Sequence, residues 1–215
     1  MKNRVTIHKK DLVLFQGDSI TDCGRSRDVN GFNTGLGTGY ALMIAAQLLS
    51  SRPADGLRFS NRGISGNRIV DLYARIKADV VNLKPDVLSV LIGVNDTWHE
   101  FGNGNGVAVP KYERVFREFL GETRESLPHA RFVLCEPFVL ECGVVTKEWV
   151  AEMAQRRVVV KKLAKEFDAV FVPFQTMFDH ALELAPPEYW AADGVHPTAA
   201  GHMLMTHAWL KAVDA

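Results

Sequence analysis

Short, continuous apolar runs alternate along this chain with stretches in which apolar residues recur every three or four positions. A short apolar run between turn residues is typical of a β-strand buried on both faces, whereas the longer spacing is typical of a helix that buries one face. The apolar runs lie at residues 12–15, 57–60, 87–92, 131–135 and 169–172, and the helical spacing lies at 69–83, 112–120, 149–167 and 201–210. The alternation therefore predicts about five parallel strands covered by helices on both faces.

This arrangement is an α/β fold, a three-layer α/β/α sandwich around a flavodoxin-like parallel sheet. The 215 residues contain no internal repeat and no linker rich in proline or serine. Because a chain of this length fits one domain, we predict a single domain over residues 1–215. In an open parallel sheet, ligands bind beyond the carboxyl ends of the strands, so functional residues are expected in the loops that follow the apolar runs.

The most informative of these loops lies near the C-terminus, where Asp193 and His196 stand three residues apart before a helix expected to begin near Pro197. At this spacing a carboxylate can accept the Nδ1–H of the imidazole and leave Nε2 free to act as a base. Ser19, which follows the first apolar run, can meet that Nε2. The three residues are a candidate nucleophile, base and orienting acid.

Attack on a carbonyl also needs donors directed at the developing oxyanion. Three predicted loops can supply them: the backbone N–H groups of Ser19 and Gly63 and the side-chain amide of Asn95. Glycine at position 63 would leave room for the acyl group, because it has no side chain. Each of these loops taken alone is also explained by an ordinary turn or helix cap.

Together these segments resemble the SGNH hydrolases, also called GDSL-type esterases. The resemblance lies in four blocks that occur in the family's order: residues 17–19, Gly63, residues 93–96 and residues 193–197. It implies a serine esterase with Ser19 as nucleophile, His196 as base and Asp193 as the orienting acid. It also implies Gly63 and Asn95, with Ser19, as oxyanion donors, and it implies no cofactor.

Residues 17–25, 35–40 and 63–67 are more specifically similar to the intracellular bacterial acetylxylan esterases. That branch removes acetyl groups from short xylo-oligosaccharides and forms homo-oligomers. The resemblance therefore implies a small acetylated oligosaccharide as substrate, a homo-oligomer and a cytoplasmic location. A short-chain lipase, a lysophospholipase or a thioesterase of the same family remains an alternative. A carbohydrate-binding module is the non-enzyme alternative, and it would tolerate loss of the Ser19 hydroxyl.

Further residues near the predicted site have two interpretations each. Trp98 and Trp190 can stack on a sugar ring or pack in the core, and Arg62 can contact substrate or remain solvated or salt-bridged. Ser65 is a rival nucleophile, but we expect it to cap a helix that begins near Asn67. The glycine-rich stretches 35–39 and 102–106 lack the third glycine of a nucleotide-binding loop, so we predict that both are loops or turns.

Charge and composition exclude several other classes. Lys and Arg number 25 and so do Asp and Glu, so no net charge attracts nucleic acid or an anionic membrane. No apolar run approaches the roughly 20 residues of a membrane span, and residues 1–10 do not resemble a signal peptide. His202 could join Asp193 and His196 as metal ligands, but no metal-binding spacing supports this. We therefore expect no metal, no nucleic acid or membrane partner, and a cytoplasmic protein that acts on a small ester.

Overall fold

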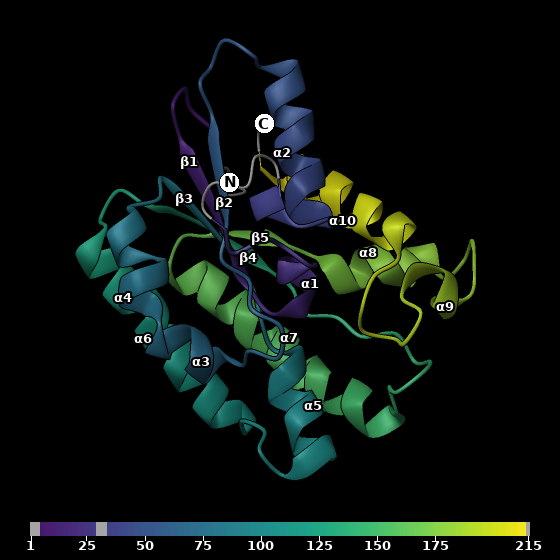
Figure 1. Cartoon of the computed structure of the whole chain (residues 1–215). Coiled ribbons are helices and arrows are strands. Elements are labelled where there is room, and N and C mark those ends of the chain that lie inside the picture. Colours follow the sequence, from purple (N-terminus) through teal and green to yellow (C-terminus); the bar gives the residue numbers. More distant parts are fainter. Residues whose placement is uncertain (1–4, 29–33, 214–215) are drawn as a thin grey trace.

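A computed structural model describes residues 5–28 and 34–213 of the chain. Its centre is a five-stranded, wholly parallel sheet in the order β2-β1-β3-β4-β5 (Figure 1). The strands are β1 (Leu12–Gly17), β2 (Arg58–Asn61), β3 (Val87–Leu91), β4 (Arg131–Cys135) and β5 (Val170–Val172). All five predicted strands are present, with ends within two residues of those expected.

Helices cover both faces of the sheet, which confirms the three-layer α/β/α prediction (Figure 1). One face carries α2 (Tyr40–Ser51), α8 (Phe174–Ala181) and α10 (Ala199–Ala212), and the other carries α3 (Ile69–Ala74), α4 (Ile76–Asp79), α6 (Val109–Ser126) and much of α7 (Lys147–Glu166). The remaining elements are α1 (Ser19–Asp22), α5 (Val94–Asn103), α9 (Pro187–Trp190) and the 3-10 turns η1 (Thr34–Leu36) and η2 (Val81–Leu83).

The alternation of side chains along the strands explains the two cores. Val13 and Phe15 of β1 pack into the core beneath α2 and α10, and Leu14 packs into the core beneath α3 and α6. Successive side chains of a strand point to opposite faces, so an apolar run fills both cores at once. This is why β3, in the middle of the sheet, is buried at all five positions.

Two expected elements differ in detail from the structure. The helical spacing at 69–83 does not form one helix. It is divided into α3, α4 and η2 at Arg75 and Val80, where the backbone leaves the helical conformation. The Arg75 guanidinium bonds to Asn67 and to the Arg62 carbonyl, which ties this break to the preceding loop. The predicted loop at 102–106 begins inside α5, which ends at Asn103 with Gly104 as its left-handed cap.

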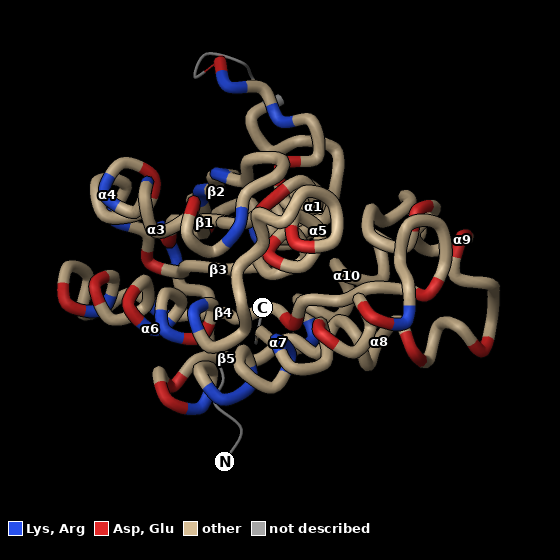
Figure 2. The backbone as a smooth tube through the Cα atoms, turned by 90° about the horizontal axis from the view of Figure 1, so that it is seen from below, with Lys and Arg blue, Asp and Glu red and all other residues tan. Residues whose placement is uncertain are grey.

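Charged residues of both signs are interspersed along the helices rather than gathered into a stripe of one sign (Figure 2). Within residues 5–28 and 34–213, no helix is both long and apolar enough to cross a membrane. Strands β1 and β3 lie side by side, and at their carboxyl ends the chain enters α1 and α5. The edge of the sheet that the sequence predicts for ligands therefore carries Ser19 and Asn95, in the first turns of the helices that follow these two strands.

Candidate active site

Ser19 is the first residue of α1, directly beyond the carboxyl end of β1. The turn is held by Asp18, whose Oδ1 accepts the backbone N–H of Ile20 at 3.0 Å and caps the short helix. Asp18 is buried, whereas Ser19 is partly exposed. The local sequence thus presents the serine hydroxyl at the surface of the sheet edge on a fixed turn.

The structure brings Ser19, His196 and Asp193 together in the predicted order. Ser19 Oγ lies 2.8 Å from His196 Nε2, and His196 Nδ1 lies 2.6 Å from Asp193 Oδ2. With the Nδ1 proton donated to Asp193, Nε2 is the acceptor for the serine hydroxyl. A hydroxyl that faces an oriented imidazole is the arrangement that activates serine for nucleophilic attack.

Asp193 is itself fixed by the turn in which it lies. Its Oδ1 accepts the backbone N–H groups of Val195 at 2.9 Å and His196 at 2.7 Å, which leaves Oδ2 for the imidazole. Partial burial raises the pKa of Asp193, but hydrogen bonds from the His196 side chain and from the two backbone N–H groups outweigh it. The net pKa lies below the ordinary 3.8, so Asp193 is a carboxylate at neutral pH. The following helix α10 begins at Ala199, two residues later than expected.

Two further carboxyl groups lie buried beneath the site. Burial raises the pKa of Asp18 to about 7, although the hydrogen bond from the Ile20 N–H and the charge of His196 lower it in part. Burial likewise raises the pKa of Asp96 to about 7, although the charge of Arg156 and the hydrogen bond from the Ile69 N–H lower it in part. Near neutral pH these groups are partly protonated, so they oppose a nearby oxyanion less than two full negative charges would.

Asn95 lies in the first turn of α5, with its side chain almost completely buried. Its Nδ2 donates to the Asn67 carbonyl at 3.2 Å, which fixes the amide orientation and leaves the second Nδ2 hydrogen for another acceptor. The backbone N–H of Ser19 stands at the start of α1, where helices leave their N–H groups unpaired. Ser19 and Asn95 therefore remain candidate oxyanion donors.

Gly63 does not fit the donor role predicted for it. Its N–H donates to Asn61 Oδ1 at 2.8 Å, so that hydrogen is already used inside the protein. A side chain at position 63 would collide with the backbone of Thr21 and Asp22, so glycine is needed there for close packing of two loops. The predicted role of Gly63 in the oxyanion hole is therefore wrong.

Gly66, three residues later, fits the role instead. Among the hydrogen bonds within residues 5–28 and 34–213, none uses its N–H, and nothing lies within 4 Å of the position a Cβ would take. Ser65 on one side is bonded to Asp22 of α1, and Asn67 on the other accepts from Asn95. Gly66 is thus held between the helix of the nucleophile and the third donor, with a φ of +83° that glycine adopts most readily.

Ser65 has a structural role different from the one expected. It caps no helix, because α3 begins only at Ile69 with Arg68 as its N-cap. Its N–H and hydroxyl both point to Asp22 Oδ2, at 3.1 and 3.3 Å. The Ser65 hydroxyl therefore donates to a carboxylate instead of an imidazole, which leaves Ser19 as the serine with an oriented base.

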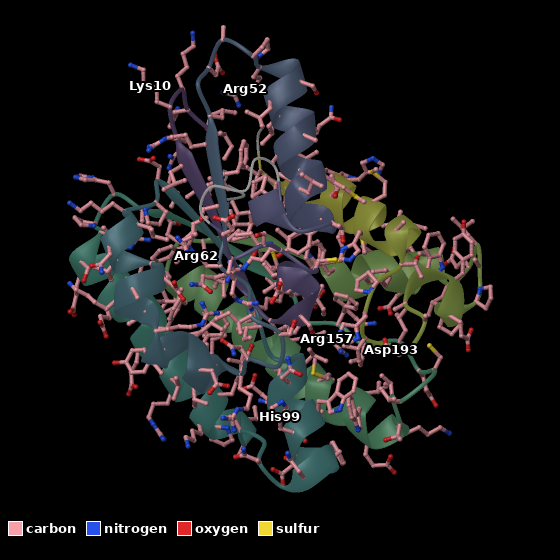
Figure 3. All side chains as sticks on the ribbon, viewed as in Figure 1. Lys10, Arg52, Arg62, His99, Arg157 and Asp193 are labelled. Carbon is pink, nitrogen blue, oxygen red and sulfur yellow. The ribbon has the colours of Figure 1, made fainter. Side chains whose placement is uncertain are left out.

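The three predicted substrate contacts lie in different surroundings. Trp98, on α5, is half-buried, and its ring centroid is 5.8 Å from that of His196. Trp190 is 8 % exposed, and its indole N–H donates to the carbonyls of Ala181 and Ala185. Trp190 therefore packs in the core, which is the second of the two roles considered for it. Arg62 lies on the β2 side of the molecule, well apart from Asp193 (Figure 3).

Arg62 lines a cavity of about 460 Å³ that it shares with Arg25 and Arg27. Among the described residues that line this cavity, Ser19, Asp193 and His196 are absent. Contact of Arg62 with a substrate bound at Ser19 is therefore not supported by its position.

His202 is buried on α10, and both of its ring nitrogens face groups of the protein. Its Nδ1 accepts the backbone N–H of Tyr40 at 3.2 Å, and its Nε2 lies 3.4 Å from the Cys23 sulfur. Over the described ranges, no group of three His, Cys, Asp or Glu side chains has a geometry that would hold a metal. His202 serves to join α10 to the loop that follows α1.

The lowered pKa of His202 should make the free energy of unfolding depend on pH. Burial, with a smaller contribution from the charge of His196, lowers the pKa of His202 to about 4 from its ordinary 6.5. Between these values the unfolded chain binds the extra proton, so the stability falls as the pH falls. We expect His202 alone to remove about 2 kcal/mol of unfolding free energy between pH 7 and pH 5.

Urea unfolding at the two pH values measures this change. Because Asp18 and Asp96 titrate in the same range with the opposite sign, the wild type must be compared with His202→Gln. The wild type should lose more stability than the variant on going to pH 5. An equal pH dependence in the two proteins would contradict the assignment.

Comparison with known proteins agrees with this geometry. Residues 15–204 match the model of the GDSL-like lipase/acylhydrolase family. The acetylxylan esterase of Geobacillus stearothermophilus is 38% identical over 206 residues, which cover 94% of this chain and 93% of that protein. Its crystal structure superimposes with a TM-score of 0.88 at 37% identity, covering 97% of this chain and 96% of that one. A GDSL-like lipase-family protein of Parabacteroides merdae superimposes with a TM-score of 0.95 at 43% identity, covering 98% and 99% of the two chains.

Proposed function

The chain belongs to the GDSL-like lipase/acylhydrolase family and is a carboxylic ester hydrolase, and we propose that it removes acetyl groups from short xylo-oligosaccharides with Ser19 as the nucleophile. The observation that supports Ser19 as the nucleophile is the continuous chain of hydrogen bonds from Ser19 through His196 to Asp193. The likeness to an acetylxylan esterase over nearly the whole chain supports the choice of acyl group and sugar.

In the first half-reaction, His196 Nε2 takes the hydroxyl proton of Ser19 as Oγ attacks the ester carbonyl. The carbonyl oxygen becomes an oxyanion, which the N–H groups of Ser19 and Gly66 and the free Nδ2 hydrogen of Asn95 stabilise. Asp193 stabilises the imidazolium that forms. When the tetrahedral intermediate collapses, the bond between the acyl carbon and the sugar oxygen breaks, and His196 protonates the departing sugar hydroxyl.

In the second half-reaction, water attacks the acetyl group on Ser19 and gives its proton to His196 Nε2. The same donors hold the second oxyanion, and acetate leaves as Ser19 recovers its proton from the imidazolium. No step in this sequence requires a group beyond the protein's own side chains, its backbone N–H groups and water.

Substrate comparison tests the sugar assignment. The same machinery would hydrolyse short-chain lipids, lysophospholipids or acyl thioesters, which are the alternative substrates for this family member. We expect kcat/KM for acetylated xylobiose to exceed that for a lysophospholipid or an acetyl thioester. The opposite order would replace the carbohydrate assignment with the lipase or thioesterase alternative.

Replacing Asn95 with Ala should lower kcat by about 10²–10³-fold, because one donor to the oxyanion is lost. KM should change little, since this donor binds the transition state more strongly than the ground state. Steady-state kinetics with a small acetate ester measures both constants. Circular dichroism checks that the variant is folded, and near-normal kcat in a folded variant would remove Asn95 from the oxyanion hole.

We also propose that the enzyme is a homo-oligomer in the cytoplasm, as expected from its likeness to intracellular acetylxylan esterases. Exposed apolar side chains at Leu182, Leu184 and Tyr189 lie close together in sequence and support an interface. Light scattering of the purified protein tests the homo-oligomer, and a mass near 23.9 kDa would contradict it. Cell fractionation tests the cytoplasmic location, and recovery of the enzyme outside the cytoplasmic fraction would contradict it.

A further inference from the structure

The position of His196 determines which side of Ser19 receives the alcohol part of an ester. His196 must protonate the leaving oxygen, so the departing sugar lies against the imidazole. The carbonyl oxygen of the acyl group must instead reach the oxyanion donors, among them Gly66 and Asn95. A side chain that contacts the His196 ring therefore lies next to the departing sugar.

A row of aromatic ring contacts links His196 to α5 and the start of α7. The centroid of the Trp98 ring is 5.8 Å from that of His196, and the centroid of Trp149 is 5.3 Å from that of Trp98 in an edge-to-face contact. Phe101 then stacks on Trp149, with centroids 5.9 Å apart and ring planes inclined by 22°. The two α5 rings are three residues apart, a rise of about 4.5 Å along the helix.

Phe101 is the most exposed member of this row. Phe101 is 47% exposed, whereas Trp149 beneath it is only 5% exposed. One face of the Phe101 ring is supported by Trp149, and the ring as a whole is left largely open to solvent. A flat apolar face supported from below suits the C–H face of a pyranose ring, whose hydroxyl groups can stay in water.

The support beneath this ring is rigid, because a buried polar network joins α5 to α7. Thr97 donates to Glu152 at 3.0 Å, and the fully buried Arg156 donates to Thr97 at 2.9 Å and also bonds to Glu152. Helices α5 and α7 also lie side by side (Figure 1). Phe101 and Trp149 are therefore held in position before a ligand binds, which lowers the entropic cost of binding.

We propose that Phe101, supported by Trp149, forms a subsite for the sugar residue next to the acetylated one on the leaving-alcohol side. This inference rests on the proposed function, since it requires a carbohydrate ester. The subsite makes Phe101 a specificity-determining residue that distinguishes an oligosaccharide from a monosaccharide. Trp98, between Phe101 and His196, lies where the acetylated residue itself would bind.

The test compares Phe101→Ala with the wild type on acetylated xylobiose and on acetylated xylose. We expect kcat/KM for the disaccharide to fall about five- to tenfold, mainly through KM, because one ring contact is lost. The value for the monosaccharide should not change. Phe101→Tyr keeps the flat ring and should behave as the wild type, whereas Phe101→Leu keeps apolar bulk without a flat ring and should behave as Phe101→Ala.

Val158→Ala is the matched control, because Val158 is a 67% exposed apolar residue on α7 outside this row. An equal effect of Phe101→Ala on both sugars, or no effect on either, overturns the subsite. A change in preference among 4-nitrophenyl esters of increasing acyl length overturns it too, because the ring would then contact the acyl chain. A wild type that cleaves 4-nitrophenyl acetate but neither acetylated sugar overturns the proposed function, and the subsite with it.

Discussion

Replacing Ser19 with Ala is expected to lower kcat/KM for 4-nitrophenyl acetate by at least about 10⁴-fold. The alanine variant has no oxygen with which to form the acyl-enzyme, so His196 can act only on water. The residual rate would come from the oxyanion donors and from binding, which remain in place. An activated ester is the appropriate substrate for this measurement, because it reports the chemical step whatever sugar the enzyme prefers.

The structure provides the controls for this variant. The partly exposed Ser19 hydroxyl contacts His196, so its loss should leave circular dichroism and urea unfolding unchanged within error. Ser50→Ala removes an exposed hydroxyl that donates to the Gln47 carbonyl, and it should retain wild-type activity. Activity retained in Ser19→Ala but lost in Ser65→Ala would move the nucleophile to Ser65.

Replacing Asp193 with Asn is expected to lower kcat by about 10³–10⁴-fold with little loss of stability. The Asn oxygen can still accept the backbone N–H groups of Val195 and His196, so the turn should keep its shape. Its amide would, however, present N–H to His196 Nδ1. The imidazole would then carry its proton on Nε2, where it cannot accept the hydroxyl proton of Ser19.

The tautomer can be observed directly. Nitrogen-15 NMR of labelled histidine should place the proton of neutral His196 on Nδ1 in the wild type and on Nε2 in Asp193→Asn. Kinetics on the same samples should show the loss in kcat. A variant with normal kcat, or a loss of kcat without a change of tautomer, would contradict the orienting role of Asp193.

The fold could be predicted from the sequence because the central strands β1, β3 and β4 are buried on both faces. Such strands appear as continuous apolar runs, and helical stretches between them indicate a parallel sheet between two helix layers. The break at Arg75 could not be predicted in the same way. It depends on bonds from the Arg75 side chain to the 62–67 loop, which are contacts between parts that come together only on folding.

The triad could be predicted because each member lies beside a local signal, a strand end or a turn before a helix. Gly66, the candidate oxyanion donor that replaces Gly63, could not be identified from the sequence, because the choice depends on whether the Gly63 N–H is already used by Asn61. The sequence does contain one relevant signal, the Ser65-Gly66-Asn67 turn, in which glycine favours a positive φ. The roles of Trp98 and Trp190 depended likewise on burial, which tertiary packing determines.

The most direct test of a carbohydrate acetylesterase with Ser19 as nucleophile is acetate release from acetylated xylo-oligosaccharides by the wild type, with the folded Ser19→Ala variant measured in parallel. We expect the wild type to release acetate and the variant to lose nearly all of this release. Equal release by the two proteins would contradict Ser19 as the nucleophile. Absence of release by a wild type that still hydrolyses lysophospholipids or acyl thioesters would contradict the carbohydrate acetylesterase.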